Sequence, residues 1–232
     1  MRKIAGSNIL LVVAHPDDEV LGCGGTIFEN TKAGNRVWCL VLGEGITSRA
    51  DLTVIQKKKL LNLLKNSAKN ANRLLNVEKV ILRNFPDNQF DSVPLLKIIH
   101  SIENIVEKFC PNVIFTHSLS DVNVDHRIVI KAVEAVVRPG IRQYIEKVFS
   151  FEAPSSTDWN FIKKPFRPNV FVSLEKNSLD KKIGALKKYE GEIRKFPHPR
   201  SETYLRALAT VRGGQSGYKL AEAFELIYSR ML

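Results

Sequence analysis

The sequence predicts an α/β protein in which helices cover both faces of a mostly parallel sheet, giving a three-layer sandwich. Apolar runs of strand length alternate with longer segments of helical period, and a βαβα order joins parallel strands by right-handed crossovers. The first run, NILLVVA over residues 8–14, is almost continuously apolar, as in a strand buried on both faces. The chain has 232 residues and no internal repeat or Pro/Ser-rich linker, so a single domain over residues 1–232 is expected.

The first four strands and helices are predicted from the apolar runs and from the residues that end each helix. Gly34 and Asn35 stop the first helix, Pro94 suits the first turn of the third, and Pro139-Gly140 ends the fourth. The second helix has a continuous stripe of leucines and alanines. The predicted strands are 8–14, 37–42, 79–82 and 113–116, and the predicted helices are 21–33, 52–75, 94–109 and 125–137.

The rest of the chain predicts two more strands followed by a helical tail. Short apolar runs indicate strands at 147–151 and 170–174. Helices are expected at about 179–188 and 202–211, with Gly213-Gly214 breaking the second. Ligands of open sheets bind beyond the carboxyl ends of the strands, so a site is expected directly after the apolar runs.

The charge of the chain narrows the classes of partner. There are 35 Lys plus Arg against 24 Asp plus Glu, a formal net charge of +11. The basic residues lie in short scattered groups such as Lys57-Lys58-Lys59, with no interleaved aromatic residues. A stacking platform for nucleic acid is therefore not expected, and the charge favours a phosphorylated or nucleotide-linked small molecule.

Cysteine usage and hydropathy bear on the compartment. Cys23, Cys39 and Cys110 form no CxxC spacing, and their odd number cannot make a closed set of disulfides. This excludes a structural zinc knuckle and indicates a reducing compartment. The apolar run Ile9–Ala14 has six residues, too few for a bilayer span or a signal core. We therefore expect a soluble, cytoplasmic protein.

A cluster of ionisable side chains follows the first predicted strand. One imidazole and three carboxylates, in the order His15-Pro16-Asp17-Asp18-Glu19, leave a buried strand within five positions. Clustered anions repel one another unless a cation lies among them, and His and Asp are both zinc ligands. The alternative is a polar loop in which Asp18 caps the next helix.

A third ligand is expected from the segment after the fourth predicted strand. His126 begins a predicted helix, with Asp125 beside it and Asp121 five residues earlier. A catalytic zinc uses three protein ligands and a water, and a carboxylate can orient a ligand imidazole from outside. His15, Asp18 and His126 form the predicted ligand set; the alternative for His126 is a structural role at the helix start.

In such a ligand set Asp17 does not bind the metal. Asp17 is therefore the candidate base for a metal-bound water. Two imidazoles and one carboxylate also suit non-haem Fe(II), so Zn²⁺, Fe²⁺ and other divalent metals stay open.

Three motifs closely resemble those of the PIG-L/LmbE-like family of zinc-dependent N-acetyl-sugar deacetylases. They are AHPDDE at 14–19, the small-residue stretch at 22–26 and DHR at 125–127. Segments 45–49, 85–88, 150–156 and 196–201 also look like family blocks. The resemblance implies a Rossmann-like fold and hydrolysis of the N-acetyl group of an N-acetylglucosamine-type conjugate. It matches His15, Asp18 and His126 to the metal ligands and Asp17 to the general base.

The sequence departs from the family at one position. Relatives carry a second His three residues before the ligand His, where this chain has Asn123. An amide can donate to an oxyanion but cannot be a cationic acid. His117 and His198 are the candidates for protonating the leaving amine, and His117 ranks higher because it directly follows a strand.

Residues after other strands are candidate substrate contacts. The alternative for Arg49 is an ordinary surface arginine, for Asp87 and Asn88 a Pro-Asp turn, and for Arg200 a helix cap. The candidates are Arg49, Asp87, Asn88, Glu152, Ser155, His198 and Arg200.

Two rival functions stay open. The glycines at 22–25 and 43–45 suggest a nucleotide-binding Rossmann enzyme, although neither segment completes GxGxxG. Asn123 also allows a metal- or sugar-binding protein that keeps the fold with little turnover. The sugar, the group linked to it and a homo-oligomeric state are not determined by the sequence.

Overall fold

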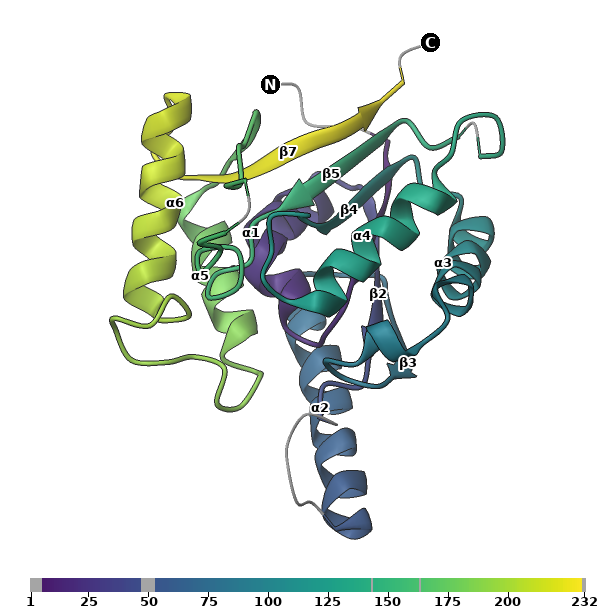
Figure 1. Ribbon diagram of the computed structural model, residues 1–232. Coiled ribbons are helices and arrows are strands. Elements are labelled where there is room, and N and C mark those ends of the chain that lie inside the picture. Colours follow the sequence, from purple (N-terminus) through teal and green to yellow (C-terminus); the bar gives the residue numbers. More distant parts are fainter. Residues whose placement is uncertain (1–5, 47–52, 143, 163, 231–232) are drawn as a thin grey trace.

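A twisted, mostly parallel sheet forms the centre of the computed structural model (Figure 1), which describes residues 6–46, 53–142, 144–162 and 164–230. Within these residues the strand order is β3-β2-β1-β4-β5-β7-β6. The first five of these strands are parallel, and β7 is antiparallel to both β5 and β6. The strands are β1 (Asn8–Val13), β2 (Arg36–Gly43), β3 (Lys79–Phe85), β4 (Val113–His117), β5 (Lys147–Phe151), β6 (Val170–Ser173) and β7 (Ala221–Ser229).

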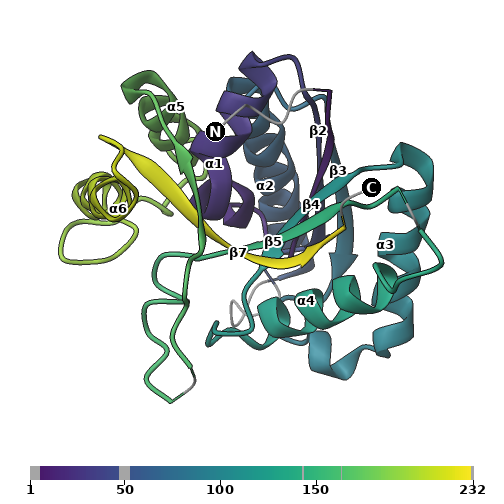
Figure 2. The same ribbon diagram turned by 90° about the horizontal axis from the view of Figure 1, so that it is seen from above.

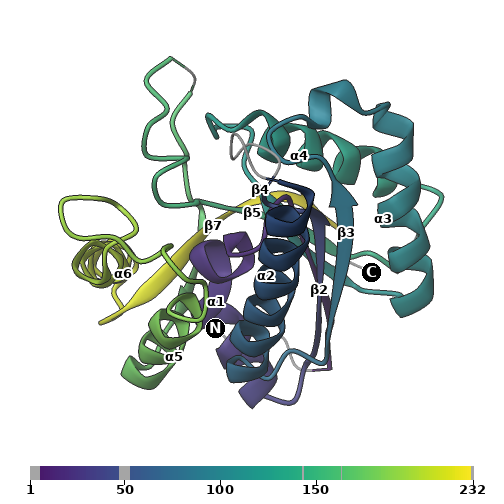
Figure 3. The same cartoon turned by 90° about the horizontal axis from the view of Figure 1, so that it is seen from below.

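Helices cover both faces of the sheet, which confirms the predicted three-layer fold class (Figures 2 and 3). Helices α1, α2 and α5 lie on one face with α6 beside α5, and α3 and α4 lie on the other. The helices are α1 (Asp18–Lys32), α2 (Val54–Leu74), α3 (Leu95–Phe109), α4 (Val124–Val136), α5 (Lys176–Leu186) and α6 (Glu202–Ser216), with a short 3-10 turn at Phe90–Ser92.

The core explains why the first strand is continuously apolar. Ile9, Leu11 and Val13 pack in the cluster that includes α1, whereas Leu10 and Val12 pack in the cluster that includes α3 and α4. Successive side chains of a strand point to opposite faces, and here both faces are covered. Within the described residues, no helix is long and apolar enough to cross a membrane.

The end of the chain differs from the prediction. Helix α6 does not break at Gly213-Gly214 but continues to Ser216 and stops at Gly217, whose φ is 77°. Gly213 instead permits a close approach, because a Cβ there would lie 2.7 Å from the Lys219 carbonyl oxygen. The chain then forms β7, a strand that the sequence did not predict.

The glycines after the first strand also have a packing role, which does not fit the nucleotide-binding alternative. Residues 22–25 lie buried inside α1 rather than in a loop. The helix is kinked at Cys23, and a Cβ on Gly22 would overlap the ring of Phe151 in β5. These glycines let α1 lie close to the sheet, so they form no phosphate-binding turn. Helix α1 itself begins at Asp18, three residues earlier than predicted.

Candidate active site

The carboxyl ends of β1 and β4 bring three side chains together. His15 follows β1, Asp18 begins α1, and His126 lies in the first turn of α4. His126 Nε2 is 3.3 Å from His15 Nδ1 and 3.3 Å from Asp18 Oδ2, and His15 Nδ1 is 3.5 Å from the same oxygen. The three atoms thus form a nearly equilateral triangle in a largely buried position.

The size of this triangle fits a tetrahedral metal ion. Zinc binds nitrogen and oxygen ligands at about 2.0–2.1 Å, so neighbouring ligand atoms of a tetrahedral site are about 3.3–3.4 Å apart. The donor set of two imidazoles and one carboxylate is typical of zinc enzymes and also of Fe(II) sites. His15, Asp18 and His126 are therefore able to hold such an ion.

Surrounding carboxylates orient both imidazoles. His15 Nε2 lies 2.9 Å from Asp125 Oδ2 and 3.1 Å from Asp87 Oδ1. His126 Nδ1 lies 2.9 Å from Asp121 Oδ2. A nitrogen that donates to a carboxylate leaves the other ring nitrogen as the ligand, which for these residues is the nitrogen inside the triangle.

The charges of the site shift the pKa values of both imidazoles. Burial lowers the pKa of His15, but its hydrogen bonds to Asp125 and Asp18 outweigh burial and raise the pKa to about 10. Burial likewise lowers the pKa of His126, yet the charges of Asp18 and Asp121 raise it to about 9. Protons therefore compete with a metal for both ligand nitrogens.

Asp17 lies next to the triangle and outside it. Its backbone has a φ of 108°, a left-handed conformation that is strained for a residue with a Cβ, and its N–H donates to Glu19 Oε2. Its carboxylate accepts a hydrogen bond of 2.8 Å from Arg200 Nη1. Burial raises the pKa of Asp17, the Arg200 charge opposes this, and the neighbouring Asp18 adds to it.

Arg200 ties a distant loop to this corner of the site. Besides Asp17, it donates from Nε to Ser155 Oγ at 2.8 Å and forms an ion pair with Glu192. The sequence suggested that Arg200 binds an anionic group or caps a helix. The structure shows instead that its guanidinium is engaged by three side chains of the protein.

The ligand triangle and Asp17 line a cavity of about 510 Å³. Trp159, Glu192 and Arg194 also line it and were missed by the sequence analysis, because no motif or strand end marks them. Most of the predicted contacts are found in its wall: Asp87, Asn88, Asn123, Ser155, His198 and Arg200.

A comparison with the models of known protein families identifies the family of this chain. Residues 10–137 match the model of the family described as "PIG-L: GlcNAc-PI de-N-acetylase". The chain belongs to the PIG-L family. The resemblance predicted from the sequence is therefore confirmed.

Three known proteins resemble this PIG-L chain in sequence or in fold. It is 25% identical over 225 residues to the diacetylchitobiose deacetylase of Thermococcus kodakarensis, covering 94% of this chain and 82% of that protein. The conserved protein TT1542 of Thermus thermophilus has the same fold, with a TM-score of 0.76, 21% identity and 97% of each chain covered. The 4-carboxy-2-hydroxymuconate hydratase GalB of Pseudomonas putida shares it too, with a TM-score of 0.75 and 19% identity over 97% of this chain and 98% of that one. The PIG-L fold thus occurs in a hydratase as well.

Two predicted site residues lie away from the cavity of this PIG-L protein. His117 is fully buried behind His126, and its Nε2 accepts a hydrogen bond of 2.9 Å from the Ala14 N–H. Burial and the His126 charge lower the pKa of His117 to about 3, so the ring is neutral at neutral pH and has no imidazolium proton to give. The role of proton donor does not fit this position.

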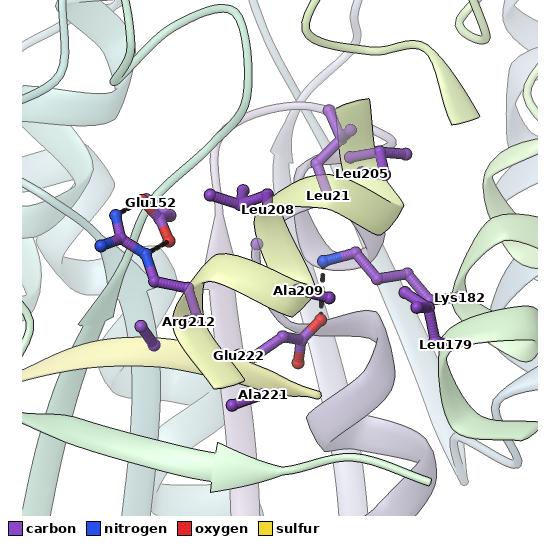
Figure 4. A pocket seen from close by; sticks show the side chains of 12 residues that line it. Leu21, Glu152, Leu179, Lys182, Leu205, Leu208, Ala209, Arg212, Ala221 and Glu222 are labelled. Atoms are coloured by element: carbon purple, nitrogen blue, oxygen red, sulfur yellow. Dashed lines mark hydrogen bonds and ion pairs between the residues drawn. The ribbon is translucent and has the colours of Figure 1, made fainter. Parts of the chain in front are cut away.

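Glu152 follows β5 as expected but points into a different, water-sized cavity between α1, α5, α6 and β7 (Figure 4). There its carboxylate accepts a hydrogen bond of 2.7 Å from Arg212 Nε, and the neighbouring Lys182 pairs with Glu222. Glu152 is therefore a buried ion-pair partner that lies outside the candidate active-site cavity. Arg49 lies outside the described residues.

Asn123 and His198 are both held by the backbone in the cavity wall. Asn123 caps α4, with Oδ1 accepting the Asp125 N–H at 2.8 Å, while its Nδ2 donates to Asn88 Oδ1 at 3.0 Å. The cap thereby determines which way the amide faces. His198 Nδ1 accepts the Arg200 N–H, and burial together with the Arg200 charge lowers the pKa of His198.

Proposed function

We propose that this PIG-L protein is a metal-dependent hydrolase that removes the N-acetyl group from an amino-sugar conjugate of the N-acetylglucosamine type. The family description and the name of the Thermococcus relative support this reaction class. The observation that carries the proposal is the triangle of His15, Asp18 and His126, which has the spacing of a metal site and shares its cavity with Asp17. The fold by itself does not determine the reaction, because a hydratase also has this fold.

His15, Asp18 and His126 would hold the metal, either Zn²⁺ or Fe²⁺. Such an ion supplies a water of lowered pKa and polarises the acetyl carbonyl. The protein side chains then have to receive a proton from this water and deliver one to the leaving amine.

Asp17 performs both proton transfers in this proposal. Its carboxylate takes the proton of the attacking water, as a base held in place by Arg200. Because burial raises the pKa of Asp17, the carboxyl retains the proton long enough to give it to the amine. No separate imidazole acid is then required, which agrees with the burial of His117.

Asn123 stabilises the negative charge that develops on the acetyl oxygen. Its Oδ1 is occupied by the N–H groups of α4, so its NH₂ group faces Asn88 and the cavity. One N–H is donated to Asn88, which leaves the second for the substrate. An amide donor of fixed orientation can stabilise an oxyanion without being charged.

The rest of the cavity wall is suited to a sugar with an anionic linkage. Asp87, Asn88 and Ser155 offer short polar side chains for hydroxyl groups. Arg194 is exposed at the wall, where it would bind a phosphate, as in a sugar nucleotide or glycosyl phosphate. The unpaired thiols of Cys23, Cys39 and Cys110 support a reducing compartment such as the cytoplasm.

A screen of N-acetylated glycosides and sugar nucleotides tests the function. Freed primary amine and acetate are measured together with the metal content of the same sample. We expect a chelator to abolish amine release and added Zn²⁺ or Fe²⁺ to restore it. If no acetylated sugar releases amine while the protein retains metal, the hydrolase proposal fails and a binding protein with little turnover takes its place.

Variants separate the roles within the site. His126→Ala should lose both metal and activity, whereas Asp17→Asn should keep about one metal per chain and lose turnover. His100→Ala is the matched control, because His100 is exposed on α3, and it should leave both unchanged. Full activity of Asp17→Asn would contradict the assignment of the base.

A further inference from the structure

An arm of the chain carries the most exposed apolar side chains of the described residues. The segment between β5 and β6 extends away from the body of the molecule (Figures 2 and 3). In this segment Phe161 and Ile162 are 87% and 97% exposed, and Trp159 is 45% exposed. Large apolar side chains that gather at one exposed place mark an interaction site more often than single ones do.

Trp159 connects this segment to the candidate active-site cavity. The ring of Trp159 contacts that of His198 with centroids 5.5 Å apart, and both residues line the cavity. His198 belongs to a turn closed by its N–H and the Lys195 carbonyl oxygen, and this turn carries Phe196, which is 65% exposed. We call the set of Trp159, Phe161, Ile162 and Phe196 the apolar rim.

Basic residues accompany the apolar rim along the sequence. The sequence has no Asp or Glu between Asp158 and Glu175, or between Glu192 and Glu202. The exposed cations of these two stretches form no ion pair with any residue that the structure describes. They are Lys164, Arg167, Arg194 and Lys195.

We propose that the apolar rim docks this protein on the surface of an anionic lipid bilayer, with the cavity opening beside the headgroups. Aromatic and aliphatic side chains at an exposed tip insert among the upper acyl chains, and nearby Lys and Arg bind anionic headgroups. Each such cation contributes about 1 kcal/mol, or about a fivefold gain in binding.

A second copy of the chain is a poorer match for the apolar rim. Each copy carries a formal net charge of +11, and a contact of two rims would place the same unpaired cations against one another. Like charges that meet across an interface oppose association. An anionic bilayer supplies the opposite charge and an apolar interior at once. The docking goes beyond the proposed hydrolysis and does not depend on it.

Vesicle binding of the full chain tests the proposal. Sedimentation with phosphatidylcholine vesicles containing about 30% phosphatidylglycerol should show binding that weakens with salt, and vesicles of phosphatidylcholine alone should bind far less. The fluorescence of Trp159 should shift to shorter wavelength on binding. Trp38, the other of the two tryptophans, is buried in the core, so the shift reports on the apolar rim.

Two double variants make the test specific. Phe161→Ser with Ile162→Ser should weaken binding at least about tenfold, since two exposed apolar side chains are lost from the insertion. The control is Val54→Ser with Ile55→Ser, a pair that is 84% and 81% exposed at the start of α2, which projects in another direction (Figures 1 and 2). The control should bind as the unmodified protein does.

Three results would overturn the proposal. They are the absence of binding to anionic vesicles, an equal loss in both double variants, and self-association in light scattering that only Phe161→Ser with Ile162→Ser abolishes. The last result would assign the apolar rim to a second copy. Unchanged thermal unfolding of both variants shows that neither loss is due to misfolding.

Discussion

Arg200→Ala removes a buried cation from the candidate base. The guanidinium donates from Nη1 to Asp17 Oδ2 at 2.8 Å, and Asp17 is only 4% exposed. Burial raises the pKa of Asp17, and the Arg200 charge is the chief influence that lowers it. Without Arg200 the pKa of Asp17 must rise further, so the carboxylate needed as a base forms only at higher pH.

The size of this effect follows from the single charged hydrogen bond. Hydrogen bonds to charged groups contribute about 1.5–3 kcal/mol, and about 1.36 kcal/mol corresponds to one pKa unit. The acidic limb of the kcat/KM profile should therefore move up by about 1–2 pH units. At a pH below the acidic limbs of both proteins, the ionised fraction of Asp17 in Arg200→Ala should be about 10–100-fold lower than in the unmodified protein. The value of kcat/KM should be lower by the same factor.

The assay is amine release measured as kcat/KM between about pH 5 and pH 10. Arg200→Lys keeps the charge and should return the limb most of the way. Ser155→Ala removes the 2.8 Å contact of Arg200 Nε but leaves the cation, so its limb should not move. A loss in Arg200→Ala that is equal at every pH would refute the reasoning, because it would show that Arg200 acts through structure or substrate binding alone.

Three further predictions concern the metal and the packing of the sheet. Asp121→Asn should weaken metal affinity by about 10–100-fold in a chelator competition, because the carboxylate orients a ligand imidazole. Loading the metal at pH 7 should release about two protons in a pH-stat, because the pKa values of His15 and His126 are raised to about 10 and about 9, and affinity should fall as the pH falls. Gly22→Ala should lower the thermal midpoint by roughly 3–10 °C through overpacking against β5, whereas Gly184→Ala, which has open space around its Cα, should not.

The parallel part of the sheet could be predicted because its signal is local. Each of β1, β2 and β4 is buried on both faces, so each is a nearly unbroken apolar run whatever its neighbours are. Strand β7 carries Glu222 and Glu225 within its sequence, which interrupts that pattern. Glu222 is tolerated because Lys182 and the N–H groups of α1 bind it, and those partners lie far away along the chain.

The candidate metal ligands could be predicted for the same reason. An imidazole and several carboxylates directly after a buried strand are unfavourable without a cation, and this is visible within five positions of the sequence. The fourth-strand segment repeats the pattern around His126. Short motifs thus suffice to predict the chemistry of the candidate site, and the family resemblance rests on the same motifs.

Tertiary structure alone decided which charged groups pair. Asp17 meets Arg200 across 183 positions of sequence, and His15 meets Asp125 across 110. Glu152 leaves a strand end like the site residues, yet it turns to Arg212 in another cavity. A sequence shows which ionisable groups stand at the strand ends. Their partners depend on how loops from separate strands fold over one edge of the sheet, because electrostatic and hydrogen-bond energies depend on distance in space.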